Sequence, residues 1–302
     1  MITILGPTAT GKTRLAALVA AQINGEIISA DSRQVYRGMD IGTGKDIADY
    51  EVDGKMMPVH LTDIADPGYE YNVYEYQRDF HAAYRDIVAR GKTPLLCGGT
   101  GLYLEAVLKG YELQQVPENQ QLRAELEQMS QEELVQLLSS YKQPHNVSDV
   151  TDHTRLIRAI EIGSFYHLYP QLAGQTPDPD PLVFGILYER AILRERITQR
   201  LQARLQQGMV EEVKRLLATG LKPKQLAFYG LEYKFLTRYV LGELTYDQMV
   251  SLLTIAIHQF AKRQMTWFRR MERNGIRIHW IDGNLPAEEK MEIILDEMNK
   301  SV

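Results

Sequence analysis

The first thirteen residues of the chain constrain its fold more than any other segment. Residues 1–5 (MITIL) are apolar and predict a short buried strand. They lead directly into Gly6-Pro-Thr-Ala-Thr-Gly11-Lys12-Thr13, which fits the phosphate-loop pattern G-x-x-x-x-G-K-[ST] at every fixed position. Apolar residues at helical spacing follow. The segment therefore predicts a strand, a glycine-rich loop and a helix, in the order that this motif requires.

The loop predicts a phosphate-binding site built largely from backbone. Glycines let successive N–H groups curve around a phosphate, and the helix N-terminus adds the positive end of its dipole. Lys12 is expected to reach the outer phosphate, and the Thr13 hydroxyl is the predicted ligand of Mg²⁺, the one cofactor expected. The complete predicted phosphate-binding set is Gly6, Pro7, Thr8, Ala9, Thr10, Gly11, Lys12 and Thr13.

Length, composition and cysteine content are those expected of a globular protein of the cytoplasm. With 302 residues, 44% hydrophobic and 24% charged, it is long enough for a large domain with an insertion. No apolar run reaches 18 residues, so we expect no membrane span. The first strand begins at Met1, which leaves no room for a signal peptide. The single cysteine, Cys97, excludes an internal disulfide and favours a cytoplasmic location.

Charge is distributed unevenly along the chain. The net charge is −5, yet residues 190–280 contain 17 Lys and Arg against 7 Asp and Glu. A basic surface of this kind is typical of a phosphate-rich partner such as a nucleic acid. Solvated helices rich in arginine are the alternative explanation.

Strands alternate with helices along most of the sequence. Besides the first, strands are predicted at 26–30, 93–97, 182–187 and 275–281, and helices at 73–90, 102–108, 190–219, 245–273 and 286–299. This order predicts an α/β fold with a P-loop-type parallel sheet core flanked by helices. Ligands bind at the carboxyl ends of such strands, so we expect residues 6–13, 31–34 and 98–103 to converge on one site.

One segment departs from this alternation. Residues 120–141 and 152–167 are helical in pattern, and 170–181 is a polar, proline-rich return. We therefore predict an inserted all-helical subdomain at 113–180, with the catalytic core formed by 1–112 and 181–302. Continuation of one domain is the alternative.

The carboxylate of Asp31 follows the second predicted strand, whereas the third ends in Gly98-Gly99-Thr100. An ordinary phosphate-loop NTPase carries an acidic residue at the end of such an apolar strand to orient water. Asp31 suits removal of a proton from an acceptor instead. These residues alone predict Mg²⁺-assisted transfer from a phosphorylated donor, and a small-molecule kinase remains compatible.

An ordered set of motifs extends over nearly the whole chain. It comprises the phosphate loop, residues 26–43 (EIISADSRQVYRGMDIGT), 58–61 (PVHL), 98–103 (GGTGLY), 152–161 (DHTRLIRAIE) and 261–269 (AKRQMTWFR). In this order the set resembles the tRNA dimethylallyltransferases, also called tRNA isopentenyltransferases.

The resemblance implies a donor, an acceptor and three catalytic residues. The donor would be dimethylallyl diphosphate, and the acceptor N6 of adenine 37 (A37) in the anticodon stem-loop of tRNA. N6 would attack C1 of the prenyl group and release pyrophosphate from the phosphate loop. Asp31 would be the general base, Thr8 would contact the diphosphate, and Thr100 would position the adenine or Asp31. Turn or helix capping is the alternative role for these side chains.

The resemblance also implies an RNA-binding set. It includes residues beside Asp31, on the insertion and in the C-terminal helix: Asp31, Ser32, Arg33, Gln34, Thr100, Arg123, Arg155, Leu156, Ile157, Arg158, Ala159, His258, Gln259, Lys262 and Arg263. For the arginines of the insertion, a solvated helix face is the alternative. Gln264 lies in the same motif match, and its side chain is expected to approach the donor or the RNA. We expect no obligate protein partner.

The sequence departs from the family pattern near residue 230. Leu231 and Glu232 stand where tyrosine and a basic residue are usual, Ile257-His258 replaces Thr-Arg, and Val59 stands where histidine is common. His258, Lys234 and Arg238 are candidate replacements for the two lost positive charges. Two functions remain as alternatives to tRNA prenylation. One is that of an adenylate isopentenyltransferase, and the other is that of a degenerate RNA-binding paralogue without turnover.

Overall fold

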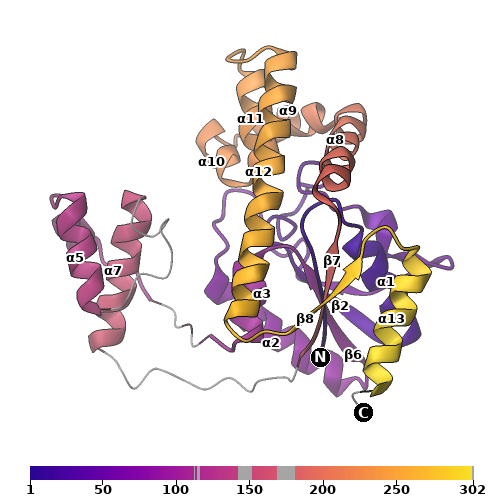
Figure 1. Cartoon of the computed structure of the whole chain (residues 1–302). Helices are drawn as coiled ribbons and strands as arrows, with labels where there is room; N and C mark the ends of the chain where they lie inside the picture. The colour runs from indigo at the N-terminus through magenta and orange to yellow at the C-terminus, as the bar shows by residue number, and fades with distance from the viewer. Residues whose placement is uncertain (112, 114–115, 142–151, 169–180, 301–302) are drawn as a thin grey trace. The chain divides into compact units, whose positions relative to one another are not determined.

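Six short parallel strands form the central sheet of the computed structural model (Figure 1). In sheet order they are β5 (Val59–His60), β2 (Gly25–Ala30), β6 (Thr93–Gly98), β1 (Ile2–Leu5), β7 (Leu182–Leu187) and β8 (Ile278–Asp282). Each strand pairs with its neighbour in parallel, so all six carboxyl ends meet at one edge. The predicted α/β class with a parallel sheet is confirmed.

The structure describes residues 1–111, 113, 116–141, 152–168 and 181–300. The chain divides into two compact units, Met1–Lys109 with Asp178–Val302, and Gly110–Pro177. The insertion was predicted to begin at residue 113 and end at residue 180, three residues from each of these limits. Most of the predicted proline-rich return lies outside the described residues.

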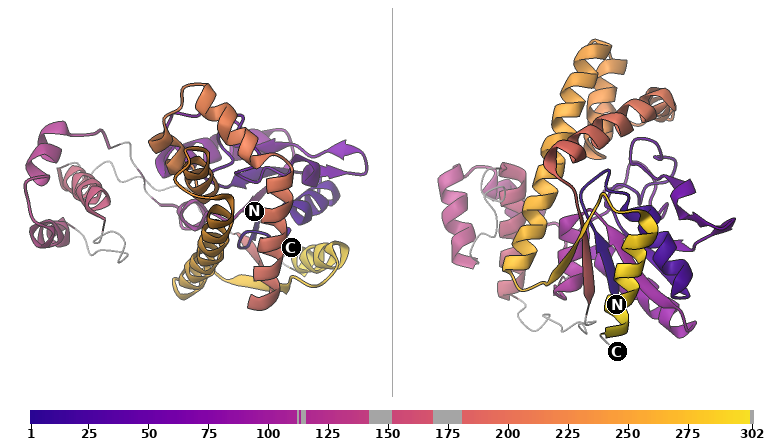
Figure 2. Two further views of the ribbon diagram at one scale, coloured as in Figure 1. Left: turned by 90° about the horizontal axis from the view of Figure 1, so that it is seen from above. Right: turned by 45° about the vertical axis from the view of Figure 1, so that its right-hand side comes forward.

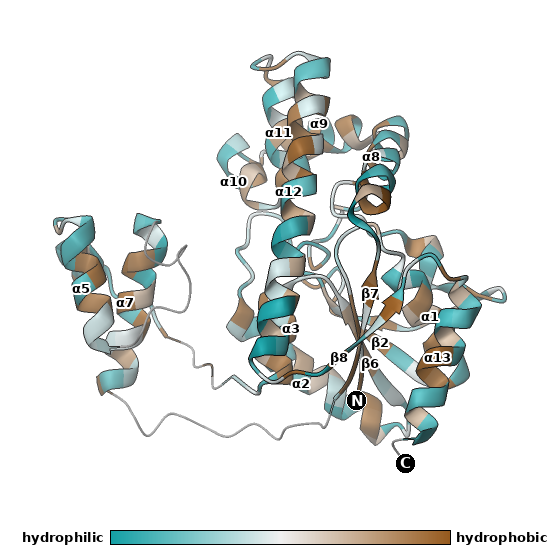
Figure 3. Ribbon diagram, in the orientation of Figure 1, coloured by the Kyte–Doolittle hydropathy of each residue, from teal (hydrophilic) through white to brown (hydrophobic). Residues whose placement is uncertain are grey.

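Helices cover both faces of the sheet in the larger unit (Figure 2). On one face α1 (Lys12–Gln22) and α13 (Ala287–Lys300) bury apolar residues against alternate strand positions such as Ile4 and Ile27. On the other face α2 (Val73–Ala89), α3 (Gly101–Leu108) and α12 (Tyr246–Arg273) share a core with Leu5 and Ile28. Because both faces are covered, the strands are largely hydrophobic, as Figure 3 shows.

The helices after β7 extend beyond the carboxyl edge of the sheet (Figure 1). They are α8 (Arg190–Gln206), α9 (Met209–Ala218), α10 (Pro223–Phe228) and α11 (Leu231–Val240), packed with the N-terminal part of α12. The single helix predicted at 190–219 is wrong. Gly208 adopts φ 99°, a left-handed conformation that ends α8 and lets α9 start in a new direction.

Short strands and turns account for the other differences from the predicted elements. β5 has two residues and lacks the length from which a strand could be recognised. β8 starts at Ile278, three residues later than predicted, because Gly275 at φ 93° belongs to the turn after α12. A short helix η1 (Ile47–Tyr50) leads into a hairpin of β3 (Glu51–Val52) and β4 (Lys55–Met56). Neither α10 nor α11 was predicted.

The regular elements in the described part of the smaller unit are all helices. It contains α4 (Gln120–Leu126), α5 (Gln131–Tyr141) and α7 (His153–Leu168), which enclose a small core of leucine and isoleucine. The single helix predicted at 120–141 is wrong, since the chain breaks after α4 and Ser130 accepts a hydrogen bond from the Glu133 amide to start α5.

Within the described ranges, every helix is too short or too polar to cross a bilayer.

Candidate active site

Three strands bring the predicted catalytic segments together. Leu5 pairs with Gly98, and Gly98 pairs with Ala30, so the phosphate loop after β1 lies beside the segments after β6 and β2. Asp31 and Thr100 follow directly at this edge. The close approach at Gly98 requires glycine, because a Cβ there would collide with the backbone of Ala30.

Thr100 fixes the segment that carries Asp31. Its backbone N–H donates to the Ala30 carbonyl at 3.1 Å, and its hydroxyl oxygen accepts from the Ser32 amide at 3.0 Å. Asp31 Oδ1 accepts from the Arg33 amide at 3.0 Å. Thr100 occupies the N-cap position of α3, but its side chain turns to Ser32 rather than to the helix. The geometry thus gives Thr100 a positioning role toward Asp31.

The phosphate loop has the curvature that its sequence predicts. Gly11 adopts φ 76° and Ala9 φ 65°, and the Thr10 hydroxyl donates to the Pro7 carbonyl at 2.9 Å. Lys12 Nζ lies 3.5 Å from the same carbonyl oxygen. Burial lowers the pKa of Lys12, and nearby guanidinium groups add to this effect while Asp31 opposes it. A bound diphosphate would favour the charged ammonium.

Gln264 of α12 ties the phosphate loop to the end of β6. Its side-chain oxygen accepts from the Thr8 amide at 2.9 Å, and its side-chain nitrogen donates to the Gly99 carbonyl at 2.8 Å. Gln264 is 7% exposed; its hydrogen bond to the Gly99 carbonyl is buried, and the one from the Thr8 amide is partly buried. The motif match included Gln264 without indicating that it joins two loops.

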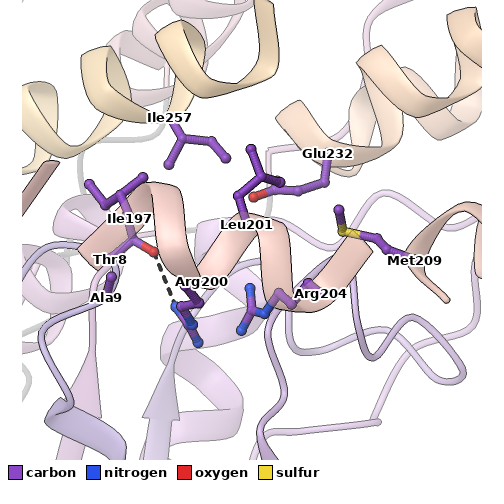
Figure 4. A pocket seen from close by; sticks show the side chains of 9 residues that line it. All are labelled: Thr8, Ala9, Ile197, Arg200, Leu201, Arg204, Met209, Glu232 and Ile257. Carbon is purple, nitrogen blue, oxygen red and sulfur yellow. Dashed lines mark hydrogen bonds between the residues drawn. The ribbon is translucent and has the colours of Figure 1, made fainter. Parts of the chain in front are cut away.

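Three arginines on one face of α8 surround the phosphate loop. Arg196 Nε donates to the Ala9 carbonyl at 3.0 Å, and Arg200 Nη1 donates to the Thr8 hydroxyl at 3.3 Å (Figure 4). Arg204 is one helical turn further along. The sequence analysis missed these residues, although their spacing of four was a signal that they share a helix face.

Asp46 holds two of these arginines in place. Its carboxylate lies 2.5 Å from Arg200 Nη2 and 3.0 Å from Arg204 Nη2. Burial opposes ionisation of Asp46, but the two guanidinium groups prevail and lower its pKa. Gly44, at φ 74°, gives the Arg204 guanidinium a flat backbone surface on which to pack. The result is a fixed positive wall beside the loop.

A cavity of about 20 Å³ lies between this wall and α12, enough for a single water. Its lining combines polar groups of the loop, arginine and Glu232 with apolar side chains (Figure 4): Thr8, Ala9, Ile197, Arg200, Leu201, Arg204, Met209, Glu232 and Ile257. Burial raises the pKa of Glu232.

None of the three candidate replacements for the missing basic residues lines this cavity. His258 Nε2 contacts the Arg194 carbonyl at 3.1 Å, and Arg238 pairs with Glu243 at 3.0 Å. The Lys234 ammonium lies over the Phe235 ring, 5.9 Å from its centroid. Arg200 and Arg204 bring positive charge to the cavity that Glu232 also lines.

The comparisons with known proteins agree with this geometry. Residues 34–271 match the IPP transferase family. tRNA dimethylallyltransferase 2 of Bacteroides fragilis is 58% identical over 300 residues, covering 99% of this chain and 98% of that protein. The chain belongs to the IPP transferase family. tRNA dimethylallyltransferase 1 of Parabacteroides distasonis is 57% identical over 302 residues, covering 100% and 98% of the two chains. The predicted family and the transferase class are confirmed.

Solved structures of this family share the fold. The full-length tRNA isopentenylpyrophosphate transferase from Bacillus halodurans aligns with a TM-score of 0.72 and 32% identity, over 99% of this chain and 95% of that one. A eukaryotic dimethylallyltransferase acting on tRNA aligns with a TM-score of 0.78 and 21% identity, over 99% of this chain and 79% of that one, and shows the same fold.

The predicted RNA-binding residues of the larger unit differ in how accessible they are. Gln259, Lys262 and Arg263 are exposed on α12. Gln34 is committed to the loop before Asp46, since its side-chain nitrogen donates to the Gly44 carbonyl at 3.1 Å. The exposed side chains of Gln259, Lys262 and Arg263 are therefore the ones of this group that are accessible to an RNA.

In the smaller unit the predicted RNA-binding set needs correction. Leu156 and Ile157 are 0% and 6% exposed and belong to the core, so their side chains offer no surface to RNA. Arg123 and Arg158 both bind the buried Glu161 carboxylate. Arg155 is the most exposed arginine of this set, with its side chain 66% exposed and 3.9 Å from Asp152. Ala159 is partly buried.

The residues described in the structure contain no group of three or more acidic, histidine or cysteine side chains able to hold a metal ion by themselves. Thr13 lies in the first turn of α1, immediately after the phosphate loop. Magnesium commonly binds through few protein ligands and the phosphates of a substrate, so one hydroxyl beside a diphosphate site fits this ion.

Proposed function

We propose that this protein transfers the dimethylallyl group of dimethylallyl diphosphate to N6 of adenine 37 of tRNA in the cytoplasm. Membership of the IPP transferase family supports the donor class. The observation that carries the proposal is the meeting of Asp31 and the phosphate loop at one sheet edge, with Thr100 fixing the segment between them. This arrangement sets a proton acceptor opposite a holder of diphosphate.

Asp31 acts as the general base. The N6 lone pair is delocalised into the adenine ring, so the amine is a weak nucleophile until a proton is drawn away. N6 forms a bond to C1 of the prenyl group while one N6 proton passes to the Asp31 carboxylate. Thr100 keeps this carboxylate in place through Ser32 and the backbone of Ala30.

The phosphate loop and the α8 arginines receive the leaving group. As the bond between C1 and oxygen breaks, its electron pair moves to the diphosphate, which gains negative charge. That charge is stabilised by the loop amides, Lys12 and Arg200. Because these groups are already in place, they lower the activation barrier without having to reorganise during the reaction. Arg196 supports the loop from the Ala9 carbonyl.

Thr13 would hold Mg²⁺ together with diphosphate oxygens. When bound, the ion supplies additional positive charge to the leaving group. Thr8 contacts the same diphosphate through its hydroxyl, whose oxygen accepts from Arg200, while its amide donates to Gln264.

The tRNA presents its adenine as a base removed from the stack. A site at the end of a sheet cannot reach N6 inside a stacked loop, so the nucleotide must flip outward. Ser32 and Arg33 flank Asp31 and are placed to contact this nucleotide. Lys262, Arg263 and Arg155 contribute phosphate contacts that orient the stem-loop.

A prenyl-transfer assay with two acceptors tests the proposal. The protein is incubated with Mg²⁺, labelled dimethylallyl diphosphate and either unmodified tRNA carrying adenines 36 and 37 or free AMP. Label entering tRNA alone supports the proposal. Label entering AMP would assign the protein to the adenylate isopentenyltransferases. Binding of tRNA without label would leave a degenerate RNA-binding paralogue.

A further inference from the structure

A row of aromatic rings runs from the core to the surface beside Asp31. Tyr36 and Tyr229 are buried and meet edge-to-face, with centroids 4.5 Å apart. Phe228 continues the row, 5.4 Å from Tyr229 at an interplanar angle of 85°. Phe228 is 38% exposed, whereas Tyr36 and Tyr229 are 0% and 1% exposed. The exposed Phe228 ring is thus backed by the buried Tyr229 ring, which packs in turn against Tyr36.

Hydrogen bonds fix the inner two rings. The Tyr36 hydroxyl oxygen accepts from the Tyr71 amide at 3.1 Å, and the Tyr229 hydroxyl oxygen accepts from the Gly68 amide. Phe228 therefore has little freedom to fold away from solvent. An aromatic ring fixed at the surface is ready to bind without a large loss of side-chain entropy.

Arg33 connects this row to the catalytic segment. Its guanidinium carbon lies 5.4 Å from the centroid of the Phe228 ring, within the range of a cation–π contact. The Arg33 amide donates to Asp31 Oδ1 at 3.0 Å. The Arg33–Phe228 pair is therefore at the rim of the site in which the target adenine must be held.

The charge around Phe228 favours a nucleic acid as the occupant. Phe228 ends α10, and Lys224 lies four residues before it on the same helix face. Lys222 and Lys224 are both exposed. Proteins bind unpaired nucleotides by two kinds of contact. Basic side chains contact the backbone phosphates, and aromatic rings stack on the bases. A protein partner would need a larger apolar area than one ring provides.

We propose that Arg33 and Phe228 form a stacking platform for one unpaired base next to the target adenine in the RNA loop. This inference rests on the proposed function, because it takes RNA as the acceptor. Once the adenine leaves its stack, a neighbouring base loses a stacking partner, and the platform replaces that partner. Lys224 binds a phosphate of the same strand.

The first test compares substitutions of Phe228. Phe228→Ala is expected to raise the KM for tRNA by about 5- to 160-fold, the range for loss of one base-stacking contact. The KM for dimethylallyl diphosphate should not change, and Phe228→Tyr should restore the KM for tRNA. Tyr246→Ala is the matched control, because Tyr246 is 45% exposed and touches another ring, Tyr239, at the start of α12.

Salt dependence separates the platform from the lysine. The effect of Phe228→Ala on tRNA affinity should be the same at 50 and 200 mM salt, whereas the effect of Lys224→Ala should shrink as salt rises. The proposal would be overturned if Phe228→Ala changed the KM for tRNA and the KM for dimethylallyl diphosphate equally. It would also be overturned if Tyr246→Ala raised the KM for tRNA as much as Phe228→Ala does.

The second test identifies the base. Anticodon stem-loops with an abasic nucleotide on either side of the adenine are bound to wild type and to Phe228→Ala. At one position the abasic change should weaken wild-type binding and leave Phe228→Ala unaffected, because both changes remove the same contact. Additive losses at both positions would refute the platform. If the losses are additive but the wild-type protein still transfers the prenyl group to tRNA, only the platform proposal fails. If the wild-type protein transfers no prenyl group to tRNA, the proposed function itself is refuted.

Discussion

Replacing Gln264 with leucine tests whether α12 maintains the donor site. Leucine has a similar size but neither accepts from the Thr8 amide nor donates to the Gly99 carbonyl, the contacts at 2.9 and 2.8 Å. The substitution therefore leaves two backbone groups without their partner. Helix α12 itself should persist, because leucine is a good helix former.

The expected loss follows from the burial of these groups. Gly99 is buried, so its unsatisfied carbonyl costs about 1–3 kcal/mol. Thr8 is partly exposed, and its amide can recover a hydrogen bond from water, which reduces its share to about 0.5–1.5 kcal/mol. Together these losses should lower the free energy of unfolding of Gln264→Leu by about 1.5–4.5 kcal/mol. The same change frees the phosphate loop and should raise the KM for the donor.

Urea unfolding and steady-state kinetics measure the two effects. Gln206→Leu is the matched control, since Gln206 is exposed near the end of α8 and its substitution should leave both quantities unchanged. The KM for tRNA should change less than the KM for the donor. A stable Gln264→Leu variant with the wild-type donor KM would refute the idea that this side chain maintains the loop.

Two further predictions concern charged groups. Asp46→Asn should raise the donor KM about tenfold with little change in kcat, because Asp46 fixes two arginines by charge-assisted hydrogen bonds. Initial rates at varied donor test this, and Asp46→Glu should recover part of the loss, whereas an unchanged donor KM would contradict it. Hydrogen bonds from Arg90 hold the pKa of Glu26 at about 2 against the opposing effect of burial, with His60 adding to the shift, so Glu26 stabilises the fold above pH 4.5 and this contribution is lost as the pH falls toward 2. Urea midpoints of wild type and Glu26→Gln should therefore converge between those pH values, and a gap independent of pH would disprove the assignment.

Local patterns in the sequence were sufficient to predict the site's backbone. The phosphate loop, Asp31 and Thr100 each follow a recognisable strand, and parallel strands bring their carboxyl ends together. The long helices α2 and α12 also followed from apolar spacing, with bounds within one residue of those predicted. In these cases the signal lies in a few consecutive residues.

Contacts between distant segments could not be predicted in the same way. Gln264 binds Thr8 across 256 residues of sequence, and Arg200 meets Asp46 across 154. Neither pairing has a periodicity or spacing of its own, since each depends on how α8 and α12 pack over the loop. The spacing of the α8 arginines showed a shared face but not the partner of that face.

Breaks in helices were missed for a related reason. Apolar spacing continues through Gly208, so the pattern alone favoured one helix over residues 190–219. The left-handed conformation at Gly208 arises because Met209 and Val213 of α9 pack into the core in a different direction from α8. Leu156 was likewise assigned to RNA from its motif, although its apolar side chain fills the core of the smaller unit.

The most direct measurement is single-turnover prenyl transfer to tRNA by wild type and by Asp31→Ala, with bound donor and bound tRNA confirmed in both. The account predicts that Asp31→Ala, saturated with both substrates, transfers the prenyl group about 10²- to 10⁴-fold more slowly than wild type, as loss of a general base requires. Transfer by Asp31→Ala at the wild-type rate would contradict the assignment of Asp31 as the base, and with it the central claim about this site.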